Sequence, residues 1–231
     1  MYTCKGVVLA DGEGISADTV ISAVDPKRTF LSLVGPMNLP PEFVWNVQSI
    51  KMRGSVAKVH LLIDGAKGIP EGTLAIAPSL RYLEQAYDAA KYDEISKKPY
   101  LEITTLGNVV SVHVQFAPYA LRTSNWNEQR TRLENLVIDT LDIYFNNLKS
   151  KIIKIKSLTP LDLEETYGLT EGDLNHGQLM LDQFLFMRPI PGWSNHKTPI
   201  DGLYLCGSGV HGGGGVSGAS GRNAAQVVLK I

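Results

Sequence analysis

The chain has 231 residues, of which 44% are hydrophobic and 19% are charged. This composition supplies enough apolar side chains for one large or two small folded domains, and it excludes a wholly disordered chain. The 22 basic and 23 acidic residues give a net charge of −1, so no basic surface of the kind that binds nucleic acid is expected. Cys4 and Cys206 are too few and too far apart for a disulfide scaffold or a cysteine-based zinc site.

Targeting and metal-binding patterns are missing from the sequence. Lys5 and Asp11 interrupt the N-terminal apolar residues, so no secretory signal is expected. No uncharged apolar run reaches the roughly 20 residues that a membrane helix needs. We therefore expect a cytoplasmic protein without a transmembrane segment. His176 and His196 have no cysteine or carboxylate partners at ligand spacing, so no metal site is expected.

Short strands and short helices are predicted for the beginning of the chain. Turn residues at 11–14 separate two predicted strands, at 5–10 and 19–23. The second strand is apolar throughout, which predicts burial on both faces. A helix follows at 27–34, with Asp25 as its cap, and another runs from Pro40 to about Ile50.

The middle of the chain predicts a sheet flanked by helices. Strands are predicted at 55–64, 101–105 and 109–116, and the last two join through a turn at 107–108. Helices are predicted at 79–93 and 126–148, the second with a cap formed by Asn125 and Glu128. In the predicted strand 109–116, His113 lies on the polar face. This face either borders a ligand cavity or is exposed to solvent, and solvent exposure is the more common reason for such alternation.

Loops and one strand–loop–helix unit are predicted for the last third of the chain. A short helix follows Pro160, and long loops with a strand near 180–186 fill residues 168–199. The end is a strand at 202–206, a glycine loop at 207–215 and a helix at 217–230.

Glycine is concentrated near the C-terminus. Eight of the 22 glycines fall between Gly207 and Gly221. Residues 207–212 match G-x-G-x-x-G between a strand and a helix, an arrangement that suits a phosphate group. Only one helix and no second strand follow, so the loop cannot open a dinucleotide-binding βαβ unit. We interpret it as the closing part of a ligand site, and a loop that serves packing alone is the alternative.

The segment 201–225, DGLYLCGSGVHGGGGVSGASGRNAA, resembles the C-terminal FAD-contacting motif of phytoene dehydrogenase-like flavoproteins, which belong to the amine oxidase and glutathione reductase-like class. Further similar segments follow the same order along the chain: VISAVDP at 20–26, MRGSVAKV at 52–59, APY at 117–119 and FMRPIPGW at 186–193. The resemblance implies an α/β fold of mixed α+β character. It places a partial Rossmann-like FAD-binding domain at 1–35 and 198–231, and a substrate-binding domain with a mixed or antiparallel sheet flanked by helices at 36–197.

The resemblance also implies the site residues. The cofactor-binding set is Gly207, Ser208, Gly209, Gly214, Gly215, Val216 and Ser217. His211 and Trp193 are the candidates near the flavin ring, although a spacer role for the histidine and a structural role for the tryptophan remain open. Arg188 and Arg222 are weighed as phosphate partners. No residue stands out as an acid–base catalyst, so the flavin is expected to carry the chemistry.

The implied reaction is hydride transfer from a small apolar or amine-like substrate to FAD. Such enzymes usually carry an N-terminal half with the dinucleotide fingerprint, and no G-x-G-x-x-G precedes the glycine loop in this sequence. We therefore expect FAD binding to be weak or absent in the isolated chain, and we expect an FAD-binding N-terminal half or partner subunit. The alternative is a non-enzymatic module that lacks flavin, either for assembly as a homo-oligomer or for binding a lipid or isoprenoid.

Overall fold

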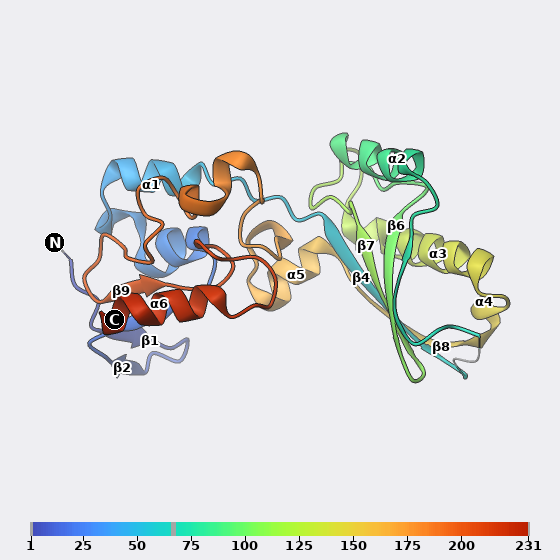
Figure 1. Cartoon of the computed structure of the whole chain (residues 1–231), viewed down its shortest axis with the longest axis horizontal. Coiled ribbons are helices and arrows are strands. Elements are labelled where there is room, and N and C mark those ends of the chain that lie inside the picture. The colour runs from blue at the N-terminus through green and yellow to red at the C-terminus, as the bar shows by residue number, and fades with distance from the viewer. Residues whose placement is uncertain (1, 66–67, 231) are drawn as a thin grey trace. The chain divides into compact units, whose positions relative to one another are not determined.

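The computed structural model describes residues 2–65 and 68–230, and the chain forms two compact units (Figure 1). Unit 1 comprises Met1–Met52 and Asp173–Ile231, and unit 2 comprises Arg53–Gly172. Helices and strands are mixed in the chain, which confirms the α/β class. The expected boundaries at 35/36 and 197/198 differ from these, because residues on both sides of them share the apolar core of unit 1. The assignment of a function to each domain stays a prediction.

Unit 2 is built on a five-stranded sheet in the order β5-β6-β7-β4-β8, in which all neighbours are antiparallel. Its strands are β4 (Val56–Ile63), β5 (Gly72–Ile76), β6 (Tyr100–Leu106), β7 (Val109–Gln115) and β8 (Ile152–Leu158). The predicted strands β4, β6 and β7 are confirmed. The strands β5 and β8 were not predicted from the sequence, and β8 alternates lysine with isoleucine at its exposed edge.

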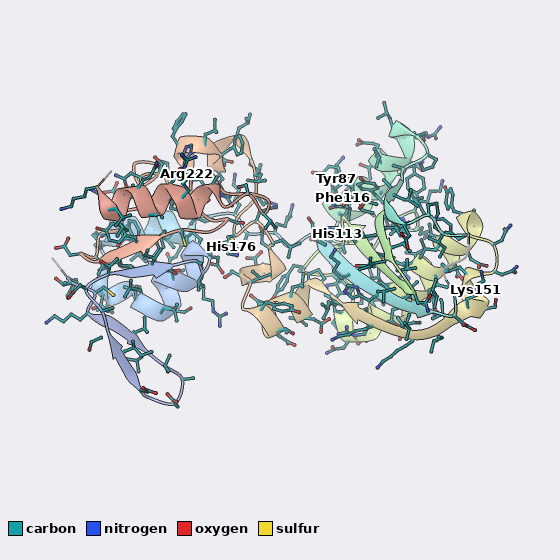
Figure 2. All side chains as sticks on the ribbon, turned by 60° about the horizontal axis from the view of Figure 1, so that its bottom comes forward. Tyr87, His113, Phe116, Lys151, His176 and Arg222 are labelled. Carbon is teal, nitrogen blue, oxygen red and sulfur yellow. The ribbon has the colours of Figure 1, made fainter. Side chains whose placement is uncertain are left out.

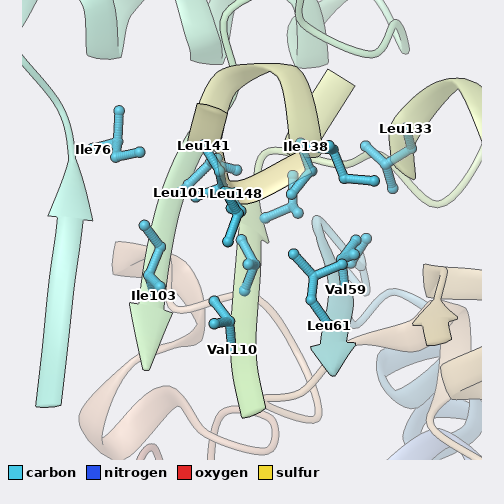
Figure 3. Close-up of a cluster of buried hydrophobic side chains, with 14 of the residues drawn as sticks. Val59, Leu61, Ile76, Leu101, Ile103, Val110, Leu133, Ile138, Leu141 and Leu148 are labelled. Carbon is cyan, nitrogen blue, oxygen red and sulfur yellow. The ribbon is translucent and has the colours of Figure 1, made fainter. Parts of the chain in front are cut away.

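One face of this sheet forms the core of unit 2. Alternation along each strand places Val59, Val112 and Ile103 in register on one face. The helix α3 (Trp126–Tyr144) supplies Leu133 and Leu141, which are fully buried in the same cluster (Figure 3). The burial of these side chains is the main contribution to the stability of unit 2.

Side chains cap three helices of unit 2. Ser79 accepts a hydrogen bond from Tyr82 N at the start of α2 (Leu80–Lys91), and Asn125 accepts one from Glu128 N at the start of α3. The predicted cap of α3 is therefore confirmed. This helix ends at Tyr144 instead of Leu148, because Phe145 is extended, and a one-turn helix, α4 (Leu148–Lys151), follows.

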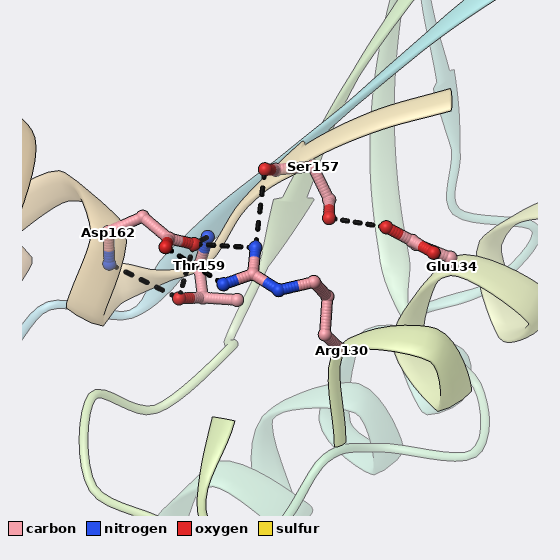
Figure 4. Close-up of polar contacts among 5 residues, drawn as sticks. All are labelled: Arg130, Glu134, Ser157, Thr159 and Asp162. Carbon is pink, nitrogen blue, oxygen red and sulfur yellow. Dashed lines mark hydrogen bonds and ion pairs between the residues drawn. The ribbon is translucent and has the colours of Figure 1, made fainter. Parts of the chain in front are cut away.

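The third cap connects three elements of unit 2 (Figure 4). Thr159 and Asp162 form a capping box at the start of α5 (Pro160–Tyr167). Arg130 of α3 binds both carboxylate oxygens of Asp162, at 2.7 and 2.8 Å. Ser157 of β8 donates to Glu134 at 2.5 Å. These bonds attach α3 to β8 and to the beginning of α5. The short helix η3 (Thr170–Gly172) follows α5.

Unit 1 contains two small sheets. The hairpin β1 (Gly6–Val8) and β2 (Gly14–Ser16) is antiparallel, whereas β3 (Val20–Ser22) pairs in parallel with β9 (Leu203–Leu205). The prediction that the strand at 19–23 is buried on both faces is wrong, since Ile21 is 45% exposed. In the described chain β3 has β9 as its only neighbouring strand.

The helices η1 (Arg28–Val34) and α1 (Pro41–Gln48) pack into a second apolar core in unit 1. Unit 1 also contains η2 (Pro36–Asn38) and α6 (Ala219–Leu229). Asp25 accepts from Arg28 N at 2.9 Å, as its predicted capping role requires. Phe43 packs edge to face against Phe30 and Trp193, with ring centroids 4.8 and 5.1 Å apart. Across residues 2–65 and 68–230, no helix has both the length and the apolar character needed to cross a bilayer.

The prediction of a strand near residues 180–186 is wrong. This segment forms two single-turn helices, η4 (Leu181–Gln183) and η5 (Leu185–Met187). The side chain of Gln183 accepts from Lys51 N at 2.6 Å and donates to Lys51 O at 3.0 Å. A buried amide side chain therefore makes the backbone contacts that a neighbouring strand otherwise supplies.

Candidate functional site

The candidate site lies where two parallel strands end. β3 leads into residues 23–26, and β9 leads into the glycine loop that begins at Gly207. Because the strands are parallel, their carboxyl ends meet at the same edge of the sheet, which is where α/β proteins bind ligands. The predicted loop is therefore in the position that its strand–loop–helix pattern requires.

Three glycines of the loop are needed for close packing. A Cβ atom on Gly207 would lie 2.9 Å from Ala23 O, and one on Gly209 would lie 2.5 Å from Pro26 Cδ. A Cβ on Gly213 would lie 2.1 Å from Ser208 O. These distances are too short for any side chain, so the packing interpretation applies to this part of the loop.

The second part of the loop is open. Gly215 and Gly218 have φ angles of 70° and 72°, and no atom lies within 4 Å of a Cβ built on either residue. Among the hydrogen bonds of the described residues, none is donated by the backbone N–H groups of residues 214–217. Val216 is fully exposed. Four free N–H groups thus precede α6, whose positive dipole end adds to their attraction for negative charge.

Arg188 fixes the glycine loop to the neighbouring loop at 175–183. Its buried guanidinium donates to Ser208 O at 2.8 Å, Gly177 O at 3.1 Å and Gln183 O at 3.2 Å. It also donates to the carbonyls of Gln178 and Asn175. All five N–H groups of the side chain are used on backbone oxygens, and burial lowers the pKa of Arg188. Arg188 is therefore a positioning residue for the loop, and it has no donor left for a phosphate. This role was not predicted from the sequence.

His211 lines an open cavity of about 610 Å³ in unit 1, together with His196 and Asn223. Its Nδ1 atom is buried without a partner in the described part of the chain. His196 lies 3.1 Å from Leu205 O through its own Nδ1, and burial is the main cause of its lowered pKa. The nearby His211 lowers that pKa further. Two histidines thus face one cavity.

The side chain of Trp193 belongs to the core of unit 1, and its chain neighbour Ser194 lines this cavity. The ring of Trp193 packs against Phe43 at the edge of the unit 1 core, and it is not among the residues that line the cavity of His211. The structure therefore does not bring the two catalytic candidates together in one described cavity, and the contacts of Trp193 are those of a structural anchor.

His176 lies beside the glycine loop, and Arg222 lies on α6 (Figure 2). A Cβ on Gly209 would lie 3.3 Å from the Cβ of His176. The Nδ1 of His176 has no partner among the described residues, and burial lowers its pKa. Arg222 is exposed on the first turn of α6. His176 is thus packed beside the glycine loop at Gly209.

A polar row crosses the second face of the unit 2 sheet. Lys58 of β4 and Glu102 of β6 lie directly opposite His113 on either side of β7. The pKa of His113 is lowered by burial and by Lys58. Phe116 contacts Tyr87 at 5.2 Å between ring centroids, and Figure 2 labels both residues together with His113. His113 is thus half-buried and flanked by both charges, an environment that strand register creates and that the single-strand pattern did not reveal.

No protein-family model matches the chain. The chain is 35% identical to "Pyridine nucleotide-disulfide oxidoreductase domain-containing protein 2" of Mus musculus, in a match that covers 98% of this chain and 44% of the mouse protein. It is 24% identical to "Phytoene desaturase (lycopene-forming)" of a Paracoccus species, over 97% of this chain and 46% of that protein. It is also 30% identical to a subunit of the limonene dehydrogenase of Castellaniella defragrans, over 55% of this chain and 24% of that protein.

A solved structure has a similar fold. The crystal structure of an oxidoreductase from Methanosarcina mazei matches 99% of this chain and 46% of its own length, with a TM-score of 0.50 and 15% identity. The chain spans less than half the length of the relatives that match it nearly throughout. The resemblance inferred from residues 201–225 is confirmed, and the chain is a homologue of a portion of the oxidoreductases that include these phytoene desaturases and pyridine nucleotide-disulfide oxidoreductase domain proteins.

Proposed function

We propose that the chain forms the ring-facing part of the FAD site of an oxidoreductase, completed by an FAD-binding N-terminal half or partner subunit. The observation that carries the proposal is the run of backbone N–H groups at 214–217 that have no partner among the described residues, in the loop between β9 and α6. The open, left-handed Gly215 and Gly218 leave space beside them. The length of the relatives supports a missing half, because the chain covers 44% of the mouse protein.

The residues of the site divide into two roles. Gly207, Gly209 and Gly213 allow the loop to pack against residues 23–26 and against itself, and Arg188 holds Ser208 in place. Gly214, Gly215, Val216 and Ser217 keep their donors for the ligand. When FAD is bound, its isoalloxazine ring supplies the hydride chemistry. The N–H groups of this chain then stabilise negative charge on their ligand, as preorganised donors do.

Unit 2 is proposed as the substrate-binding domain for an apolar or amine-like molecule. Its second sheet face carries the polar row at His113, and Phe116, which directly follows β7, contacts Tyr87 of α2. The names of two relatives refer to the apolar hydrocarbons limonene and phytoene, which supports an apolar substrate. The limonene dehydrogenase is named as an enzyme of more than one chain, which supports the proposal of a partner chain.

Flavin absorbance at about 450 nm tests the proposal. The purified chain alone is expected to hold little FAD, because the fingerprint that binds the ADP half is absent from its sequence. Addition of an N-terminal half from the mouse relative is expected to restore binding. Stoichiometric FAD on the chain alone would contradict the need for a partner, and failure of the stable complex to bind FAD would contradict the flavin site.

A matched pair of glycine variants locates the site. Gly215→Ala and Gly12→Ala both place a side chain on an open backbone position with positive φ, at 70° and 91° respectively. Neither added side chain meets a neighbouring atom, and the positive φ strains the backbone in both variants. We expect Gly215→Ala to weaken FAD binding by the completed protein at least tenfold, while Gly12→Ala leaves it unchanged. Equal effects would show that the loop is structural.

Self-association without flavin is the second candidate function. One observation favours it: Val7 and Ile15 lie opposite each other in the hairpin and are 43% and 48% exposed, and Ile21 is 45% exposed. Apolar side chains gathered near strand edges are typical of interfaces. Sedimentation analysis separates the candidates. A stable homo-oligomer that takes no flavin with any N-terminal half supports the module, whereas a monomer that becomes a flavin-containing heterodimer supports the enzyme.

A further inference from the structure

A cavity of about 540 Å³ lies within unit 2. Its walls come from the C-terminal half of α2, the segment 93–98, the segment 121–124 and the first turns of α3, and Figure 1 shows the two helices. Arg122 N donates to Asp93 O at 2.9 Å and so joins the two segments. The buried Ser96 accepts from Lys98 N at 3.1 Å and so shapes the segment 93–98 itself. The cavity is therefore framed by hydrogen-bonded backbone.

Four cationic side chains surround this cavity: Lys97, Lys98, Arg122 and Arg132. None of the four takes part in an ion pair in the described part of the chain. Two carboxylates, Asp93 and Glu94, also line the cavity, so cations outnumber anions there two to one. The whole chain has a net charge of −1, so the positive charge around this cavity is a local excess that the composition does not indicate.

Neutral amides orient two of these cations. Lys98 Nζ donates to Gln85 Oε1 at 3.3 Å, and Arg132 Nη1 donates to Gln129 Oε1 at 3.0 Å. Both glutamines line the cavity. By contrast, Lys91 and Lys149 on the same unit each bind carboxylates. A hydrogen bond to an amide holds a cation in position without cancelling its charge, so the attraction of the cavity for an anion is preserved.

We propose that this cavity binds a small organic polyanion that carries phosphate or carboxylate groups. Arg122 and Arg132 supply planar donor pairs of the kind that bind such groups in a bidentate manner, and Lys97 and Lys98 supply point charges. The hydroxyl groups of Thr123 and Ser124 line the same wall. The volume is within the range of small-molecule sites, which is larger than a single inorganic ion requires.

Calorimetric titration of the full chain with inorganic pyrophosphate, and separately with citrate, tests the proposal. Saturable one-to-one binding that weakens as salt is raised is expected. Stronger binding of pyrophosphate assigns the site to phosphate, and stronger binding of citrate assigns it to carboxylates. Absence of saturable binding of both probes at low salt would overturn the proposal.

Two variants that each remove two positive charges test whether binding takes place in this cavity. The test variant is Arg122→Gln with Arg132→Gln, and the control is Lys154→Gln with Lys156→Gln on the exposed strand β8. We expect at least tenfold weaker binding in the test variant and less than twofold change in the control. Equal weakening in both would mean unspecific charge attraction. If the arginine variant unfolds, as judged by circular dichroism, Lys97→Gln with Lys98→Gln provides the same comparison with exposed residues.

Discussion

The two units are stabilised by different kinds of contact. In unit 2, alternating strands place apolar side chains on one face of a five-stranded sheet, and three helices begin at side-chain caps. In unit 1, the sheets have two strands each, and α1 and α6 have no side-chain cap. Arg188 and Gln183 instead hold the loops through bonds to backbone atoms. The proposed ligand loop thus belongs to the unit whose structure depends on a few polar side chains.

The largest effect is expected from the loss of Arg188. Arg188→Met leaves the carbonyls of Ser208, Gly177 and Gln183 without this donor, and we expect unit 1 to lose about 3–5 kcal/mol of stability, since each unsatisfied group costs about 1–3 kcal/mol. Hydrogen exchange of the amides in β3 and β9 measures the loss, and exchange in β4 and β7 serves as the internal control. Unchanged protection of β3 and β9 would show that the apolar core alone is sufficient for unit 1.

A core truncation gives the corresponding test of unit 2. Leu141 is fully buried under the sheet, so Leu141→Ala is expected to cost about 3 kcal/mol. The control is Ile143→Ala on the same helix, where the side chain is 77% exposed and little change is expected. Unfolding in urea is monitored by hydrogen exchange of the amides of each unit. Equal loss of protection in both units would show that they unfold together and do not respond separately.

The pH dependence of unit 2 is expected to include a contribution from Asp162. Burial by itself raises the pKa of this carboxyl, but the hydrogen bonds from Arg130 and Thr159 outweigh it and lower the pKa from 3.8 to about 2. The folded state thus favours the ionised form, and its stabilisation is present above pH 4 and is lost as the pH falls towards 2.

Comparison with Asp162→Asn isolates this contribution. Because the side chain is 22% exposed, we expect a modest effect of about 1–2 kcal/mol, seen as a smaller fall in unfolding free energy between pH 4 and 2 in the variant than in the wild type. Asp139→Asn is the control, since Asp139 binds Lys149 with both side chains 61% exposed. A parallel pH profile for wild type and Asp162→Asn would refute the role of this ion pair.

The smallest effects are expected from helix starts. Asn125→Ala removes the cap of α3 and is expected to destabilise unit 2 by about 1 kcal/mol. Ser217 accepts a hydrogen bond of 3.3 Å from Ala219 N, but α6 has Gly218 at its cap position. Ser217→Ala is therefore expected to change unit 1 by less than about 0.5 kcal/mol. Thermal unfolding measures both losses of stability. A larger loss from Ser217→Ala than from Asn125→Ala would contradict the view that side-chain caps matter more in unit 2 than in unit 1.

Local patterns in the sequence predicted much of the fold. The alternation at 109–116 predicted β7, the pair of Asn125 and Glu128 predicted the start of α3, and Asp25 was found in its capping role. The glycine loop was predicted in the correct position between a strand and a helix. Each of these features depends on residues close together in the chain, whose spacing follows helix or strand periodicity.

The edge strands and the loops of unit 1 were harder to predict. β8 alternates exposed lysines with isoleucines, and only its pairing with β4 makes it a strand. The apolar residues near 180–186 have the composition of a strand, yet Gln183 binds the backbone of Lys51 and no strand forms. In both places the outcome depends on a partner far away in the sequence, which composition cannot reveal.

The sequence by itself determined the class of the fold, the main helices and strands, and the relationship to oxidoreductases through residues 201–225. Only the tertiary structure decided which glycines are packed and which are open, because that depends on the approach of residues 23–26 to the loop. It also decided that Arg188 binds backbone carbonyls, and that four cations from three separate segments surround one cavity. The physical reason is the same in each case: local spacing sets secondary structure, whereas a site is formed by residues that only the folded chain brings together.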